Sequence, residues 1–182
     1  MPSRTRIVSL FLFGSGFCAL IYQTTWLREF RLIFGASTAA SAAVLGVFMA
    51  GLGFGGIVLG RRSETKAKPL AFYAKLELFI ALSAAVSPLL IIVARQSYIA
   101  IGGTLSTGPV LGTIARLILA AIILGPPTFL MGGTLPAAAR AVVMPDDISR
   151  RTIGTLYGVN TLGAVIGALF GTFYLLRTLE IT

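Results

Sequence analysis

Residues 39–60 read AASAAVLGVFMAGLGFGGIVLG and are followed at once by Arg61 and Arg62. The run holds no charged residue, and it is long enough to cross a bilayer, which takes about 20 apolar residues in a helix. Basic residues directly after such a run are typical of the cytoplasmic end of a span. The stretch therefore predicts a transmembrane helix.

Four further apolar runs flank this one, and the predicted spans are 7–25, 39–60, 70–93, 114–143 and 153–176. The fourth run is too long for a straight span, and Pro126-Pro127, Gly132-Gly133 and Pro136 predict a kinked or broken helix. Residues 94–113, rich in Gly, Ser and Thr, are expected to form an external loop or a short interfacial element. Residues 1–182 thus read as one all-α integral membrane domain, a bundle of about five transmembrane helices, with six as the alternative.

Composition supports the same class. The 182 residues are 56% hydrophobic and 12% charged, with a mean hydropathy of +0.91, which excludes an ordinary soluble domain. The net charge of +9 is scattered between apolar runs, so we expect a lipid bilayer and no nucleic acid as partner. Without histidine, and with one cysteine in an apolar run, Cys18, the chain is expected to be no enzyme and to hold no cofactor or metal.

The distribution of Lys and Arg predicts the orientation, because cytoplasmic loops carry an excess of both. Placing the N-terminus in the cytoplasm puts ten basic residues inside, namely Arg4, Arg6, Arg61, Arg62, Lys66, Lys68, Lys75, Arg140, Arg150 and Arg151. Five remain outside, namely Arg28, Arg31, Arg95, Arg116 and Arg177. We expect a multi-pass protein of the cytoplasmic (inner) membrane of a bacterium or archaeon.

Polar residues inside the spans are the candidate binding residues, because each is costly in lipid. Glu77 lies about two turns into the third run, and Arg140 lies near the inner end of the fourth. An antiparallel helix pair would bring them together, so we predict that they face each other. Such a pair could fix helix register, or the two residues could bind a substrate or proton.

Tyr157 and Asn160 are three residues apart, which places them on one face of the fifth helix. They are candidates either for hydrogen bonds between helices or for lining a path for a cationic substrate. Trp26, beside Arg28 and Glu29 at the outer end of the first run, reads as an interfacial anchor.

Small residues recur every four positions, a spacing that lets helices pack closely in lipid. The members are Gly163, Gly167 and Gly171 in the fifth run, and Ala42, Gly46 and Ala50 together with Gly56 and Gly60 in the second. These faces are expected to pack against another helix, in the same chain or in a second copy or subunit.

Five motifs, in this order and spacing, resemble one family. They are residues 15–23 (SGFCALIYQ) with 26–28 (WLR), 48–53 (FMAGLG), 76–78 (LEL), 126–136 (PPTFLMGGTLP) with 139–140 (AR), and 156–164 (LYGVNTLGA). Together they resemble the membrane-embedded N-terminal region of spermidine-synthase-like membrane proteins. The resemblance implies a helical block related to half of a major facilitator transporter, which in that family precedes a cytosolic aminopropyltransferase-like domain. Residues 1–182 contain no pattern for that soluble domain.

Two functions are compatible with these features. One is a half-transporter that handles a small organic cation, such as a polyamine, together with a partner copy or subunit, with Glu77, Arg140, Tyr157 and Asn160 as candidate substrate-binding residues. The other is a membrane anchor or scaffold subunit of a spermidine-synthase-like enzyme or larger membrane complex, with a soluble aminopropyltransferase-like domain as a potential partner. Fold alone does not separate them.

Overall fold

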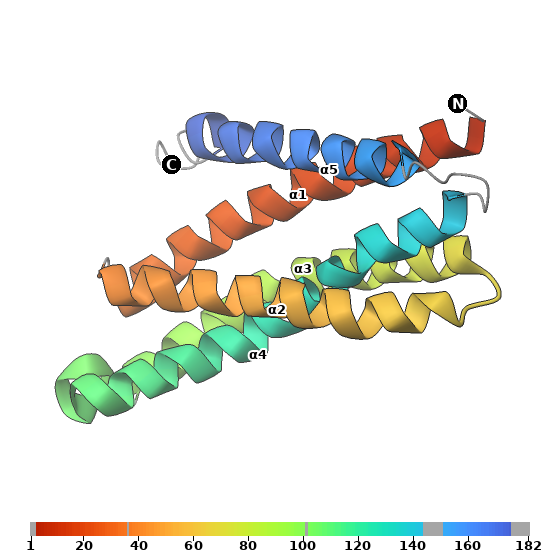
Figure 1. Cartoon of the computed structure of the whole chain (residues 1–182). Helices are drawn as coiled ribbons and strands as arrows, with labels where there is room; N and C mark the ends of the chain where they lie inside the picture. The colour runs from red at the N-terminus through yellow and green to blue at the C-terminus, as the bar shows by residue number, and fades with distance from the viewer. Residues whose placement is uncertain (1–2, 36, 101, 144–150, 176–182) are drawn as a thin grey trace.

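A computed structural model describes residues 3–35, 37–100, 102–143 and 151–175 (Figure 1). These residues form α1 (Ser3–Phe34), α2 (Thr38–Glu64), α3 (Pro69–Ala100), α4 (Gly103–Val142) and α5 (Arg151–Phe170), which continues as the π-helix η1 (Gly171–Leu175). All five helices are long and apolar enough to cross a membrane, and the described residues include no strand. The predicted all-α bundle of membrane-spanning helices is confirmed.

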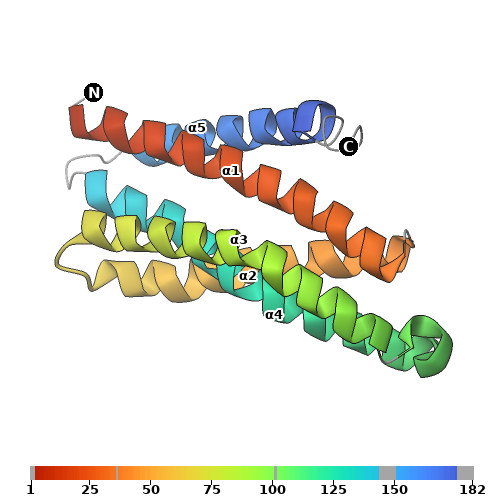
Figure 2. The same ribbon diagram turned by 180° about the vertical axis from the view of Figure 1, so that it is seen from behind.

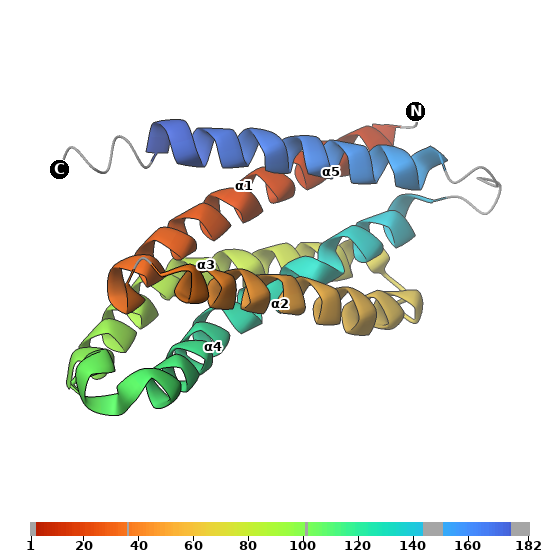
Figure 3. The same cartoon turned by 60° about the vertical axis from the view of Figure 1, so that its left-hand side comes forward.

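The helices run alternately up and down and form two layers (Figures 1 and 3). α1 packs mainly against α5, whereas α2 and α3 both pack against α4. The start of α1, the turn between α2 and α3, the end of α4 and the start of α5 lie at one end of the bundle, here named the N-terminal end (Figure 1). Short connections between long helices dictate this antiparallel arrangement.

Residues 94–113 do not form the predicted external loop or short interfacial element, because the ends of two long helices occupy most of the range. α3 continues to Ala100 since Ala94 and Tyr98 are buried in the apolar core. Arg116 of α4 also donates hydrogen bonds to the Tyr98 hydroxyl, at 3.2 Å from Nε and 3.1 Å from Nη2. α4 begins at Gly103 and has a single non-helical residue, Gly108, with φ 71° and ψ 174°. That conformation is open almost only to glycine.

α4 is not broken at its prolines, contrary to one of the two predicted alternatives. Helical backbone angles continue through Pro126, Pro127 and Pro136, and Gly108 is the only departure in the helix. Pro136 cannot donate to the carbonyl of Gly132. That carbonyl faces α2, where it lies 3.5 Å from the position that a Cβ on Gly56 would take, an ordinary van der Waals distance.

The glycine face of α5 packs against α1 of the same chain. A Cβ at Gly163 would collide with the carbonyl of Phe13, and one at Gly167 with the carbonyl of Phe17, each in the α1 backbone. Gly171 faces Thr24 Oγ1 at 2.7 Å from its Cβ position. The predicted small-residue face is confirmed, and its partner helix lies within the chain.

The second small-residue face is shifted from its predicted position. Gly46 has open space around it, whereas Gly51 and Gly55 pack against Thr128 and Phe129 of α4. The predicted pair of Gly56 and Gly60 does face α4, at Gly132 and Pro136. The shift follows from the orientation of α2 about its own axis, since only the side of α2 that faces α4 needs small residues. The glycines that meet α1 and α4 are covered by helices of the same chain, whereas the predicted face of Ala42, Gly46 and Ala50 is exposed.

Two apolar clusters fill the interior. One gathers around Phe30, Phe48 and Leu124 and joins α1 through α4, and the other gathers around Leu12, Tyr73 and Leu156 near the N-terminal end. Trp26 belongs to the first cluster: it is only 3% exposed, and its Nε1 donates to Ser87 Oγ of α3 at 2.9 Å. The prediction of Trp26 as an interfacial anchor is wrong, because this buried hydrogen bond ties α1 to α3.

Candidate functional site

A cavity of about 650 Å³ lies between α1 and α3, with Met131 of α4 at its edge. Figure 2 shows the side of the bundle on which α1 and α3 lie in front. It extends from the first turns of both helices toward the middle of the bundle. α1 contributes a face that includes Ser15, Cys18 and Tyr22, and α3 contributes Tyr73 and Glu77. The spacing of three and four residues puts each of these sets on one side of its helix.

Glu77 supplies the one acidic group of this cavity. It lies eight residues from the start of α3, about 12 Å along the axis at 1.5 Å per residue. Its nearest polar neighbours are the hydroxyls of Ser15 on α1 and Tyr73 one turn earlier on α3. Even so, Glu77 Oε1 and the Tyr73 hydroxyl are buried and have no hydrogen-bond partner of good geometry. A polar atom buried in this way is costly unless a ligand or water satisfies it.

The remaining walls are mostly apolar and partly open, with Arg4 in the first turn of α1 as the other charged group of the lining. Ile7, Leu10 and Phe11 of α1 line the cavity while being 55%, 71% and 62% exposed, so the cavity opens sideways between the helices. The ring of Tyr22 lines it from α1 and stacks on Trp26 at 5.6 Å between centroids. A carboxylate, two hydroxyls and an aromatic face among apolar walls can bind a cation with an apolar body.

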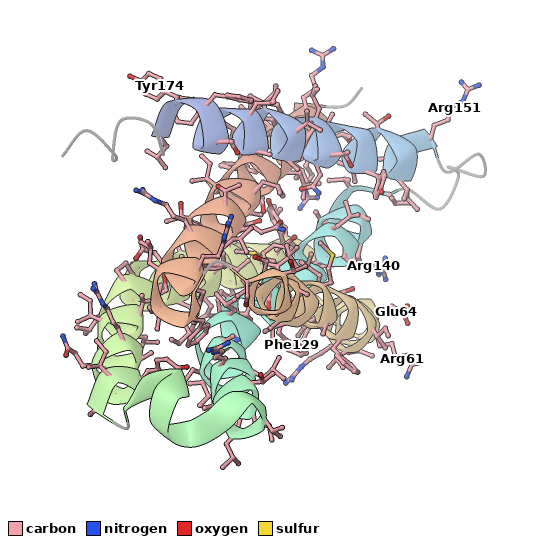
Figure 4. The ribbon with its side chains drawn as sticks, turned by 90° about the vertical axis from the view of Figure 1, so that its left-hand side faces the viewer. Arg61, Glu64, Phe129, Arg140, Arg151 and Tyr174 are labelled. Atoms are coloured by element: carbon pink, nitrogen blue, oxygen red, sulfur yellow. The ribbon has the colours of Figure 1, made fainter. Side chains whose placement is uncertain are left out.

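Arg140 does not contribute to this cavity, and the predicted pairing of Glu77 with Arg140 is wrong. Arg140 is exposed near the end of α4 and lines a second cavity, of about 680 Å³, with Arg61 and Glu64 of α2. Figure 4 shows these three side chains at the same end of the molecule. The reason is helix rotation: Glu77 lies on the side of α3 that faces α1, whereas Arg140 lies on the side of α4 that faces α2 and the start of α5.

Tyr157 and Asn160 lie on α5, outside the cavity that contains Glu77. Tyr157 is 60% exposed on the outer side of the bundle. The backbone and side-chain oxygens of Asn160 face Gly16 of α1, where a Cβ would collide with the Asn160 carbonyl. The structure therefore brings none of Arg140, Tyr157 and Asn160 next to Glu77.

Three residues of the site carried no predicted role: Ser15, Tyr22 and Tyr73. One local signal could have found Tyr73, since it lies four residues before Glu77 and so on the same helix face. Ser15 and Tyr22 come from another helix, and only the packing of α1 on α3 brings them to the carboxylate.

Comparison with protein-family models, with curated proteins and with solved structures finds no match for this chain. Among the described residues, no three His, Cys, Asp or Glu side chains gather where they could hold a metal ion. The role of the site is therefore inferred from its own geometry and chemistry.

Proposed function

We propose that the chain is a non-catalytic membrane module that binds a small organic cation in the cavity between α1 and α3. The observation that carries this proposal is the Glu77 carboxyl group, placed in a mostly apolar cavity of about 650 Å³ with Oε1 lacking a hydrogen-bond partner. The other charged group of the cavity, Arg4 in the first turn of α1, forms no ion pair with Glu77, and such an intramembrane carboxylate is a natural counter-ion for a cationic ligand. Ser15 and Tyr73 can accept hydrogen bonds from an ammonium group, and the Tyr22 ring offers a cation–π contact.

The resemblance to spermidine-synthase-like membrane proteins supports a polyamine as the cation and half of a facilitator as the architecture. On this proposal the five helices form one side of a pathway, and a second copy or another membrane subunit supplies the other. The exposed apolar side chains of α5 and η1 are available for such a partner, among them Leu162 and Val165 of α5 and Phe173 of η1. The alternative function, an anchor or scaffold for an aminopropyltransferase-like enzyme, needs no cation in the cavity.

The proposed orientation places the N-terminal end of the bundle in the cytoplasm of a bacterial or archaeal cell. Among the described residues, nine Lys and Arg lie toward this end and four toward the other. In cells, on a Cys18→Ala background, cysteine at Ala67 should resist an impermeant thiol reagent, whereas cysteine at Gln96 should react. Both positions are exposed, so the reverse pattern would overturn this orientation.

Cation binding can be tested through Cys18, which lines the cavity and is exposed. Spermidine at increasing concentration should slow the modification of Cys18 by N-ethylmaleimide in the purified chain. Charge-assisted hydrogen bonds contribute about 1.5–3 kcal/mol, so Glu77→Gln should weaken this protection about 10-fold or more.

Glu64→Gln is the matched control, because Glu64 is an exposed carboxylate that lines the second cavity. It should leave protection by spermidine unchanged. A single-charged cation, benzyltrimethylammonium, run in parallel separates charge from polyamine length. If neither cation protects Cys18 in the unmodified chain, the cation-binding proposal fails and the anchor function gains support.

A further inference from the structure

A third cavity, of about 560 Å³, lies at the N-terminal end where α2 turns into α3, away from Glu77. Four of its eleven lining residues are basic, namely Arg62, Lys66, Lys68 and Lys75, and none is acidic. The other seven are apolar, namely Leu59, Ala67, Ala71, Phe72, Leu76, Phe79 and Leu130. The cavity therefore combines a strongly positive rim with a hydrocarbon-like wall.

No acidic side chain among the lining residues neutralises the positive charge of this rim. The two acidic residues nearest along the chain, Glu64 and Glu77, line the second and the first cavity instead. Two of the last carbonyls of α2 already have donors within the turn, because Thr65 Oγ1 donates to Arg62 O at 3.1 Å and Lys66 N to Ser63 O at 3.2 Å. The basic side chains are thus not needed to cap α2.

The start of α3 adds to the positive potential. α3 begins at Pro69, and its first turn contains no acidic residue that would neutralise the positive end of the helix dipole. Lys66 lies over the Phe72 ring, 5.7 Å from its centroid, which holds the ammonium group next to the apolar wall.

The apolar wall extends inward along a membrane-spanning helix. Phe72, Leu76 and Phe79 follow one another at steps of four and three residues on one side of α3. From Pro69 to Phe79 the helix rises about 15 Å, so the wall continues from the charged end into the depth of the bilayer. A free phosphate or nucleotide would use the rim only, whereas a phospholipid would use both parts.

We propose that this cavity binds an anionic phospholipid, with its phosphate among Arg62, Lys66 and Lys68 and an acyl chain along Phe72, Leu76 and Phe79. Basic side chains beside an apolar helix groove, at the membrane surface, are the chemistry that recognises such headgroups. The inference is independent of cation binding at Glu77, since the two cavities share no residue.

The test is thermal unfolding of the purified full chain in detergent. Phosphatidylglycerol should raise the unfolding temperature with saturation, whereas phosphatidylcholine and inorganic phosphate at equal concentration should not. Each basic side chain near an anionic headgroup is expected to change affinity about fivefold, so Arg62→Gln, Lys66→Gln and Lys68→Gln combined should raise the half-saturating concentration about 100-fold.

The matched control removes three other charges from the same end of the bundle. Arg6, Arg61 and Arg151 are exposed and do not line this cavity, so their combined replacement by Gln should leave the half-saturating concentration within about twofold. If this control loses affinity as strongly, the attraction is general and the site does not exist. Stabilisation by inorganic phosphate alone would make it a phosphate site and refute the lipid.

If the triple variant fails to fold, Lys66→Gln and Lys68→Gln singly should each show the fivefold loss, and unchanged affinity in both would refute the proposal.

Discussion

Replacing Gly167 by alanine should separate α5 from α1. In the structure a Cβ at this position would lie 2.8 Å from the carbonyl carbon and 2.9 Å from the Cα of Phe17, and closer still to its carbonyl oxygen. These atoms belong to the helix backbone and cannot rotate away. Ordinary contacts of about 3.5–4.0 Å return only if α5 retreats from α1 by about 1 Å.

The cost follows from that displacement. A gap of about 0.5–1 Å removes roughly a quarter to a half of the dispersion energy of each atom–atom contact along the interface. Overpacking of this kind costs about 1–3 kcal/mol. We therefore expect Gly167→Ala to lower the free energy of unfolding by about 1–3 kcal/mol, and Gly163→Ala to do the same, since its Cβ would meet the backbone of Phe13.

The assay is equilibrium unfolding in mixed micelles with increasing dodecyl sulfate, followed by helix-sensitive circular dichroism. Gly158→Ala is the control on the same helix, because nothing lies within 4 Å of its Cβ position. That variant should be neutral or more stable, by up to about 1 kcal/mol, since alanine is the better helix former. If Gly167→Ala and Gly158→Ala behave alike, the close approach of α5 and α1 is refuted.

Further predictions concern α4 and the α1–α3 contact. Gly108→Ala should destabilise the chain by about 1–3 kcal/mol in the same assay, because φ 71° strains alanine, whereas Gly125→Ala should be nearly neutral. Ser87→Ala leaves the buried Trp26 indole N–H without its acceptor and should lower the free energy of unfolding by about 1 kcal/mol. If the losses in Ser87→Ala and Trp26→Phe add up to the loss in the double variant, the two side chains are independent and the hydrogen bond is contradicted. Gly55→Ala should cost about 1–3 kcal/mol, and an unchanged unfolding curve would contradict the tight α2–α4 packing.

The sequence predicted most of the local structure correctly where a local signal was strong. Long apolar runs predicted the five spans, and the repeat of Gly163, Gly167 and Gly171 predicted a packing face that the structure bears out. It failed where the signal was weak: residues 94–113 have moderate hydropathy, yet burial of Ala94 and Tyr98 keeps most of them helical. The proline-rich part of α4 stays helical because α2 supports it.

The candidate site depended on rotation of the helices, which the sequence does not encode locally. Glu77 was recognisable as a costly charge inside a span. Its neighbours were not, since Ser15 and Tyr22 lie more than 50 positions away along the chain and Arg140 faces another cavity.

Hydropathy alone thus determined that this chain is a bundle of membrane-spanning helices, because a long apolar run has no other stable environment. Tertiary structure decided which sides of those helices meet. Phe48 and Phe54 illustrate the difference: both lie in the uncharged run of α2, yet one is 2% and the other 65% exposed. In water an apolar stripe marks the buried side of a helix, but in lipid both sides are apolar and the stripe disappears. Only the fit of glycine faces against neighbouring backbones then fixes the rotation, and with it the place of every polar side chain.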